Sequence, residues 1–221
     1  MPVTRRIGPL TLDTLDGLPT DCRSCVAWEL DPVRAARAAA AGEAAAEKEA
    51  WVSAVLLEWG SCGRIAYVDD QPVGHALYAP PALLPRSAAF PTGPPAADAA
   101  LLASVEVRPG HGGLGLGRML VQAVVKDLAT RGIRGLEAFG RVGSDGEGGG
   151  VGGLSCLVPA GFLLAVGFKT VRPHPRTPRL RLDLRSTVSW RADVEGAIEK
   201  LLGSIQPAPV GVRRIGPEPG A

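Results

Sequence analysis

Residues 104–131 join three kinds of sequence that together allow few folds. A β-prone run ends at Val107, and Pro109 after it cannot donate to a sheet ladder. Four glycines follow within six positions, and from Arg118 apolar residues recur at helical spacing as far as Gly132, a plausible C-terminal stop. Strand, glycine loop and helix together direct free backbone N–H groups and a helix dipole at an anion. The stretch therefore predicts a site for a phosphate-bearing cofactor.

Two common phosphate-binding patterns do not fit these glycines. A nucleotide P-loop needs a Lys and a Ser or Thr directly after its glycines, and this chain has no such pair there. A dinucleotide fingerprint needs GxGxxG after an early strand, with an acidic residue about 20 positions on. Residues 113–117 do not have that spacing, and their strand lies in the middle of the chain. The alternative without a ligand is a glycine-rich turn before an amphipathic helix.

The loop instead resembles the acyl-CoA loop of the GNAT N-acetyltransferase family, usually written Gln/Arg-x-x-Gly-x-Gly/Ala. Val107 and Pro109 match the hydrophobic-x-Pro lead-in, and Gly167-Phe168 resembles the family's Leu-Gly-Phe turn after its fourth helix. Gly112 departs from the pattern, because the family usually has Gln or Arg there. The resemblance covers roughly residues 3–185, with the elements in the expected order.

The resemblance implies an α/β fold of the GNAT acyl-CoA N-acyltransferase type. Its sheet is mixed but mostly antiparallel, flanked by helices and splayed at its centre, with acyl-CoA in the splay. The implied reaction moves an acetyl group from acetyl-CoA to a primary amine. A bulge in the fourth strand, here around residues 105–107, would hold the acetyl carbonyl. The residues implied in cofactor binding are Val105, Val107, Gly112, Gly113, Leu114, Gly115, Leu116, Gly117 and Arg118.

The catalytic acid and base are less directly indicated. The family often has a Tyr four residues before the Gly of Gly-Phe, where this chain has Leu163, which cannot donate a proton. Cys156 takes the place of a cofactor-contacting Asn, so its thiol would act as the acid, be acylated, or simply fill space. Glu106 is a candidate base if its side chain faces the substrate. Asp98 and a water relay are alternatives to it, and Arg118 either adds charge at the phosphates or points into water.

The cysteines allow three interpretations. Cys22-x-x-Cys25 with Cys62 and Cys156 would form a four-thiolate zinc site, but no second CxxC supports it. A redox pair would need a thioredoxin-like βαβ pattern, which is missing. We therefore expect no metal, and a pair of helix thiols with one turned inward. Among the scattered histidines, only His111 in the glycine loop is placed to touch phosphate.

Outside the loop, periodicity predicts a helix over residues 35–59 with a break near Gly42. Gly60 would end this helix, and Glu47, Lys48 and Glu49 would form its solvated face. A GNAT-like domain over residues 1–185 would precede an extra helix and a Pro/Gly-rich tail in residues 186–221. Strands are expected at residues 3–12, 63–68, 73–78, 101–107, 133–139, 167–171 and 179–184, a helical region at 21–30, an irregular loop at 79–99, a mobile glycine segment at 143–153 and a short helix at 156–166.

Composition excludes several classes of partner. The 221 residues carry a formal net charge of +2, which indicates neither nucleic acid nor membrane. The chain has no apolar run of about 18 residues and no signal-peptide core, so we expect a cytoplasmic protein. Acetyl-CoA and an amine are the expected partners, and a homodimer is left open. Two other hypotheses remain: a catalytically weak CoA-binding sensor, and a metal-dependent interaction protein built on the cysteines.

Overall fold

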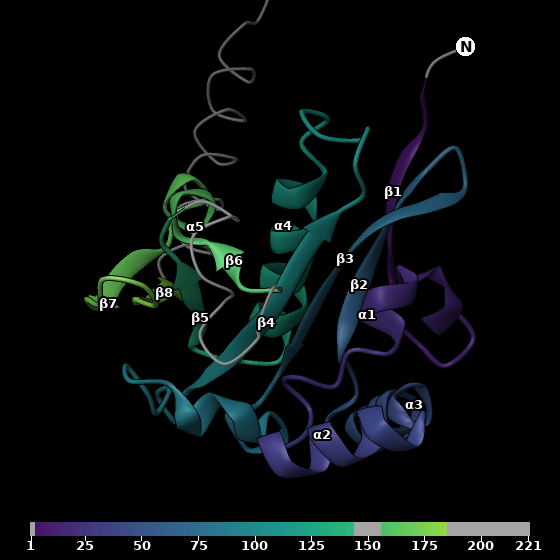
Figure 1. The fold of residues 1–221 in the computed structure, drawn as a ribbon. Helices are drawn as coiled ribbons and strands as arrows, with labels where there is room; N and C mark the ends of the chain where they lie inside the picture. Colours follow the sequence, from purple (N-terminus) through teal and green to yellow (C-terminus); the bar gives the residue numbers. More distant parts are fainter. Residues whose placement is uncertain (1–2, 144–155, 185–221) are drawn as a thin grey trace, which may run out of the picture. The chain divides into compact units, whose positions relative to one another are not determined.

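The computed structural model describes residues 3–143 and 156–184 as an α/β unit (Figure 1). Its strands are β1 (Arg5–Pro9), β2 (Gly63–Val68), β3 (Gln71–Ala79), β4 (Ala99–Val107), β5 (Gly135–Arg141), β6 (Val158–Pro159), β7 (Lys169–Arg172) and β8 (Arg179–Asp183). Its α-helices are α1 (Thr20–Arg23), α2 (Pro32–Ala41), α3 (Ala44–Trp59), α4 (Leu116–Thr130) and α5 (Ala160–Ala165). Short 3-10 turns lie at Leu15–Gly17, Pro81–Leu83 and Pro85–Ala89.

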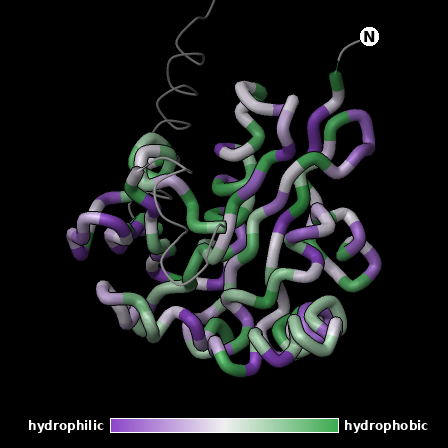
Figure 2. The backbone as a smooth tube through the Cα atoms, in the orientation of Figure 1, coloured by the Kyte–Doolittle hydropathy of each residue, from purple (hydrophilic) through white to green (hydrophobic). Residues whose placement is uncertain are grey.

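The strands form one mixed sheet in the order β1-β2-β3-β4-β5-β8-β7, with β6 beside β5. The β4–β5 and β5–β6 pairs are parallel, whereas the other neighbours are antiparallel. One face packs on the apolar side of α4, and the other packs on residues of α3 and the segment before it. The central strands β3, β4 and β5 are buried along most of their length, and Figure 2 shows hydrophobic stretches with single hydrophilic positions among them. The mixed, mostly antiparallel sheet expected from the sequence is confirmed.

The two central strands separate after a short common stretch. β4 and β5 pair only at residues 99–101 and 135–137. Farther on, β5 takes β6 as its parallel neighbour, at Gly140 and Arg141. Within the described part of the chain, β4 therefore has no β5 partner from Leu102 to Val107. Figure 1 shows the two strands leaving their common end in different directions. This is the expected splay.

Glycine positions explain where the long helical stretch breaks. Gly42 has φ 72° and Gly60 has φ 83°, the left-handed conformation that ends α2 and α3. Asp31 starts α2 by accepting hydrogen bonds from the N–H groups of Val33 (2.9 Å) and Arg34 (3.1 Å). The predicted break and end are thus confirmed.

Several predicted boundaries were wrong. The first strand covers only Arg5–Pro9, and residues 21–30 are not one helix because α1 ends at Arg23. The short helix predicted at residues 156–166 is α5 and begins only at Ala160, since Pro159 before it is extended (ψ 130°) and pairs in β6. The predicted loop contains the two 3-10 turns between β3 and β4.

Lys48 does not belong to the solvated face of α3. Its side chain is only 2% exposed and forms an ion pair with Glu29, which is 1% exposed. A long cation is tolerated inside the protein when a carboxylate neutralises it there. The prediction failed because Glu29 lies nineteen positions away and comes from a different segment.

Parts of the expected organisation lie outside the described residues. They are the C-terminal helix and tail, and the segment 144–153 of the predicted glycine loop. Across residues 3–143 and 156–184, no helix combines the length and the apolar character needed to cross a membrane.

Candidate active site

The glycine loop leads into an open helix terminus. Gly113 (φ 77°) and Gly115 (φ 75°) adopt the left-handed conformation, and Gly115 is the N-cap of α4. No side chain from the described residues caps this end of α4. The first N–H groups of an α-helix have no partner within the helix, so those of Leu116, Gly117 and Arg118 are available to a ligand. A Cβ built on Gly112, Gly113 or Gly115 would meet nothing within 4 Å. The loop therefore presents backbone donors to open space.

The other loop positions have different roles. A Cβ on Gly117 would lie 3.1 Å from the ring of Phe162, so this glycine lets α4 approach α5. Arg118 donates to the carbonyl of Ala165 at 3.2 Å, so its guanidinium caps the end of α5 as well as being exposed. Leu116 is buried in the core, and only its N–H can face a ligand. Arg5 fixes the loop by donating to the Leu114 carbonyl at 2.7 Å.

A β-bulge lies in β4, but not where it was expected. Leu77 pairs with Ser104 and Tyr78 pairs with Leu102, so Ala103 is the extra residue of β4. The expected position around Val105 to Val107 was therefore wrong. The position of the bulge depends on how β3 pairs with β4. The apolar and small residues of β4 do not by themselves reveal this pairing.

The bulge decides which way the end of β4 faces. Before it, Leu102 packs in the α4 cluster and Leu101 in the opposite one. After it, Val105 and Val107 pack toward α4, because one additional residue reverses the alternation. Glu106 consequently faces the side of α1, where it meets two other functional groups.

Those groups are the Cys22 thiol and the His75 imidazole. Cys22 Sγ donates to Glu106 Oε2 at 2.9 Å, and His75 lies opposite Glu106 in the β3–β4 ladder. One potential ligand atom from each of the three residues lies within 4.8 Å of the other two. Burial raises the pKa of Cys22, and its hydrogen bond to Glu106 adds to the increase. Burial also lowers the pKa of His75 to about 4, with help from the positive charges of Lys48 and Arg108. Near neutral pH the cluster contains a thiol, a neutral imidazole and Glu106.

His75 was missed by reasoning from the sequence. A lone histidine within a β-prone run has no partner until strand pairing is known. The one available signal was its place in the strand next to the one that carries Glu106.

The remaining thiols are separated from Cys22. Cys156 hydrogen-bonds Cys25, which lowers the pKa of Cys25 to about 6 and raises that of Cys156. Cys62 is buried, with its Sγ 3.9 Å from the Leu10 carbonyl. The four thiols therefore do not form one cluster. Cys156 lies just before β6 rather than in a helix.

Two other predicted positions are now placed. Leu163 is fully buried among the apolar residues that pack on α4, so it supplies no proton. Asp98 precedes the common end of β4 and β5 and pairs with Arg181 through contacts of 2.9 and 3.0 Å. This pairing lowers the pKa of Asp98. Asp98 is thus an ion-pair residue at the end of β4 away from the glycine loop.

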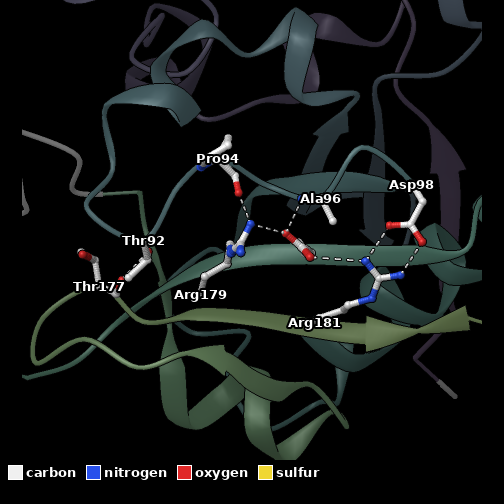
Figure 3. A network of polar contacts seen from close by, with 8 residues as sticks. Thr92, Pro94, Ala96, Asp98, Thr177, Arg179 and Arg181 are labelled. Atoms are coloured by element: carbon white, nitrogen blue, oxygen red, sulfur yellow. Dashed lines mark hydrogen bonds and ion pairs between the residues drawn. The ribbon is translucent and has the colours of Figure 1, made fainter.

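Asp98 belongs to a polar network at the closed end of the splay (Figure 3). Glu137 of β5 is 2% exposed and accepts from Arg179 at 3.1 Å and from Arg181 at 3.3 Å. It also accepts from the N–H of Ala96 at 3.1 Å, which ties the loop before β4 to β5 and β8. Leu101, the partner of Glu137, is the last β4 residue that pairs with β5. The network therefore closes the vertex from which the two strands diverge.

In the centre of the sheet β4 and β5 separate, and the N-terminus of α4, which no described side chain caps, lies beside them. Together these two features are typical of an α/β fold of the acyltransferase type. Residues 25–146 match the model of the acetyltransferase (GNAT) family, and the chain belongs to this family. Comparison with curated proteins gave no match.

Solved structures show the same fold. The PaiA N-acetyltransferase of Thermoplasma acidophilum, solved in complex with coenzyme A, is 13% identical with a TM-score of 0.53, covering 81% of this chain and 99% of that one. An N-acetyltransferase of Staphylococcus aureus Mu50 is 15% identical with a TM-score of 0.51, covering 82% of this chain and 99% of that one. At these identities the likeness concerns the fold alone.

Proposed function

We propose that the protein is an N-acetyltransferase that moves an acetyl group from acetyl-CoA to a primary amine. The observation that carries the proposal is the N-terminus of α4, where left-handed glycines leave backbone donors uncovered next to the parted strands. A pyrophosphate is an anion of the kind that such a terminus binds. Family membership and the coenzyme A in PaiA support the same ligand.

In this proposal the cofactor enters along the unpaired edge of β4. The pyrophosphate accepts hydrogen bonds from the N–H groups of Gly113 to Arg118, and the pantetheine arm runs between β4 and β5. The thioester carbonyl lies against the backbone between Val105 and Val107, beyond the bulge at Ala103 and in the part of β4 that no longer pairs with β5. A backbone N–H there stabilises the oxyanion that forms when the amine attacks the thioester carbon.

Glu106 is the proposed base. The amine must lose a proton to attack, and the bulge turns this carboxylate away from α4 toward Cys22. An incoming amine would replace the Cys22 thiol as the hydrogen-bond donor to Glu106. The departing CoA thiolate takes its proton from Cys156 or from water, since Leu163 has none to give. The hydrogen bond to Cys25 and burial raise the pKa of Cys156, which weakens it as an acid. The overall products are an N-acetyl amine and CoA.

Steady-state assays with a panel of amines test this proposal by following the release of CoA thiol. Glu106→Gln keeps the shape of the side chain but removes its basicity, and we expect kcat to fall by about 10² or more. Glu58→Gln changes an exposed carboxylate of α3 and is the matched control. Equal loss of activity in both variants, or no loss in either, would contradict the role of Glu106.

One observation favours the second candidate, a CoA-binding sensor with weak or no catalysis. The position where the family often has a proton-donating Tyr is occupied by Leu163, which is fully buried. Calorimetry separates the two functions. Tight CoA binding without turnover of any amine would favour the sensor, whereas turnover of one amine class establishes the enzyme.

A further inference from the structure

Cys22, His75 and Glu106 bring three different metal-ligand types together from α1, β3 and β4. The strand pairing sets His75 opposite Glu106, and the bulge at Ala103 keeps both side chains on one face. The thiol of Cys22 reaches the same point from α1, with Sγ 2.9 Å from Glu106 Oε2. The cluster therefore depends on three separate features of the fold.

The imidazole of His75 is a second, independent observation. The residue is 1% exposed, and its Nδ1 has no hydrogen-bond partner in the part of the chain that the structure describes. Its Nε2 has only a long contact of 3.5 Å to Ser104 Oγ. A buried ring nitrogen normally finds a partner, because an unsatisfied one costs about 1–3 kcal/mol. A metal ion bound through Nδ1 would provide that partner.

The donor set selects the chemical class of the ligand. Sulfur, nitrogen and a carboxylate oxygen suit Zn²⁺, whereas Mg²⁺ and Ca²⁺ prefer oxygen alone. Ligand atoms around a tetrahedral zinc ion lie about 3.5 Å apart, as follows from bonds of about 2.0–2.3 Å. The present limit of 4.8 Å needs only a small contraction.

Charge is also balanced at this position. A thiolate and a carboxylate neutralise a divalent cation, and a neutral imidazole adds no charge. The nearby ammonium of Lys48 is already neutralised by Glu29, which leaves the guanidinium of Arg108 as a positive charge near His75 that opposes the cation. The proton that Cys22 now donates to Glu106 would leave to solvent as the Zn–S bond forms.

We propose that Cys22, His75 and Glu106 form a Zn²⁺ site with an open fourth position. Zinc there would occupy the carboxylate that we assign as the base, so it would inhibit acetyl transfer. The inhibition rests on the proposed function, whereas binding of the metal does not.

The test is titration of metal-free full-length protein with ZnCl₂ by calorimetry, with MgCl₂ as the comparison cation. We expect about one Zn²⁺ per chain and no comparable heat with Mg²⁺. Cys22→Ser and Glu106→Gln should each weaken zinc binding by at least about 100-fold, because even outer-shell changes cost about 10–100-fold. Cys25→Ser removes a thiol three positions from Cys22 that pairs with Cys156 instead, and it should keep the affinity.

A second readout follows the metal directly. Co²⁺ in place of zinc should give a sulfur-to-cobalt charge-transfer absorption that is present in Cys25→Ser and lost in Cys22→Ser. The idea is overturned if the wild-type protein binds no Zn²⁺, or if Cys22→Ser binds it as well as Cys25→Ser does. Stoichiometric zinc without any effect on acetyl transfer would keep the site and count against Glu106 as the base.

Discussion

The buried ion pair between Lys48 and Glu29 gives the sharpest stability prediction. Lys48→Met keeps the length of the side chain but leaves the Glu29 carboxylate, 1% exposed, without its cation. Removing one partner of a buried pair costs about 3–5 kcal/mol, because the other charge stays buried and uncompensated. In a domain of this size each kcal/mol lowers Tm by about 2–4 °C, so a decrease of roughly 6–20 °C is expected.

Urea unfolding followed by tryptophan fluorescence measures the change in the free energy of unfolding. An unchanged m-value establishes that the variant and the wild type expose the same amount of surface when they unfold. Lys126→Met on the exposed side of α4 is the control and should stay within about 0.5 kcal/mol of the wild type. Adding Glu29→Gln to Lys48→Met removes the orphaned charge and retains an acceptor for the N–H of Trp28. The double variant should therefore recover at least about 2 kcal/mol. If Lys48→Met costs no more than Lys126→Met, the argument from burial is refuted.

Three further predictions concern the site. Gly115→Val forces a β-branched residue to φ 75° in the loop, and calorimetry should show CoA affinity reduced by at least about tenfold, whereas unchanged affinity would remove the loop from the cofactor site. Cys156→Ala should lower kcat by about 10² and by more than Cys156→Ser, which keeps a weaker donor; equal activity in all three forms would leave Cys156 a packing residue. The pKa of Cys25 is lowered to about 6, so the thiolate is the main form at neutral pH, and its rate of alkylation should fall about tenfold per pH unit below that value. A rate that falls already below pH 8 would contradict the hydrogen bond from Cys156.

The sequence predicted what depends on neighbouring residues. Strand, glycine loop and helix follow one another between Ser104 and Arg131, so local periodicity and backbone preference were sufficient to place them. Gly42 marked a helix break for the same reason. Their functional meaning came from the resemblance to a family, because a glycine loop alone is compatible with several ligands.

What failed depends on contacts between distant segments. Lys48 was expected in solvent because its partner Glu29 lies in another element. The bulge at Ala103 and the cluster of His75 with Glu106 arise from the pairing of β3 with β4. Cys22 and Cys25 were treated as a pair because they are close in sequence, but each thiol has a different partner. The periodicity of residues within one strand or helix does not determine how that segment is aligned with another.

The ionic network at Glu137 has a mechanical consequence for the reaction. On the side of β5 it holds β4 at one end only, so β4 and the β3 strand paired along it can rotate relative to β5 about a point near Leu101. Val107 lies six residues beyond, about 20 Å at about 3.3 Å per residue. A rotation of about 5° about this point would shift Val107 by about 1.7 Å. Misplacement of reacting groups by about 1 Å can lower the rate about 10²-fold. Side chains that touch neither cofactor nor amine can thus set the alignment of the reacting atoms.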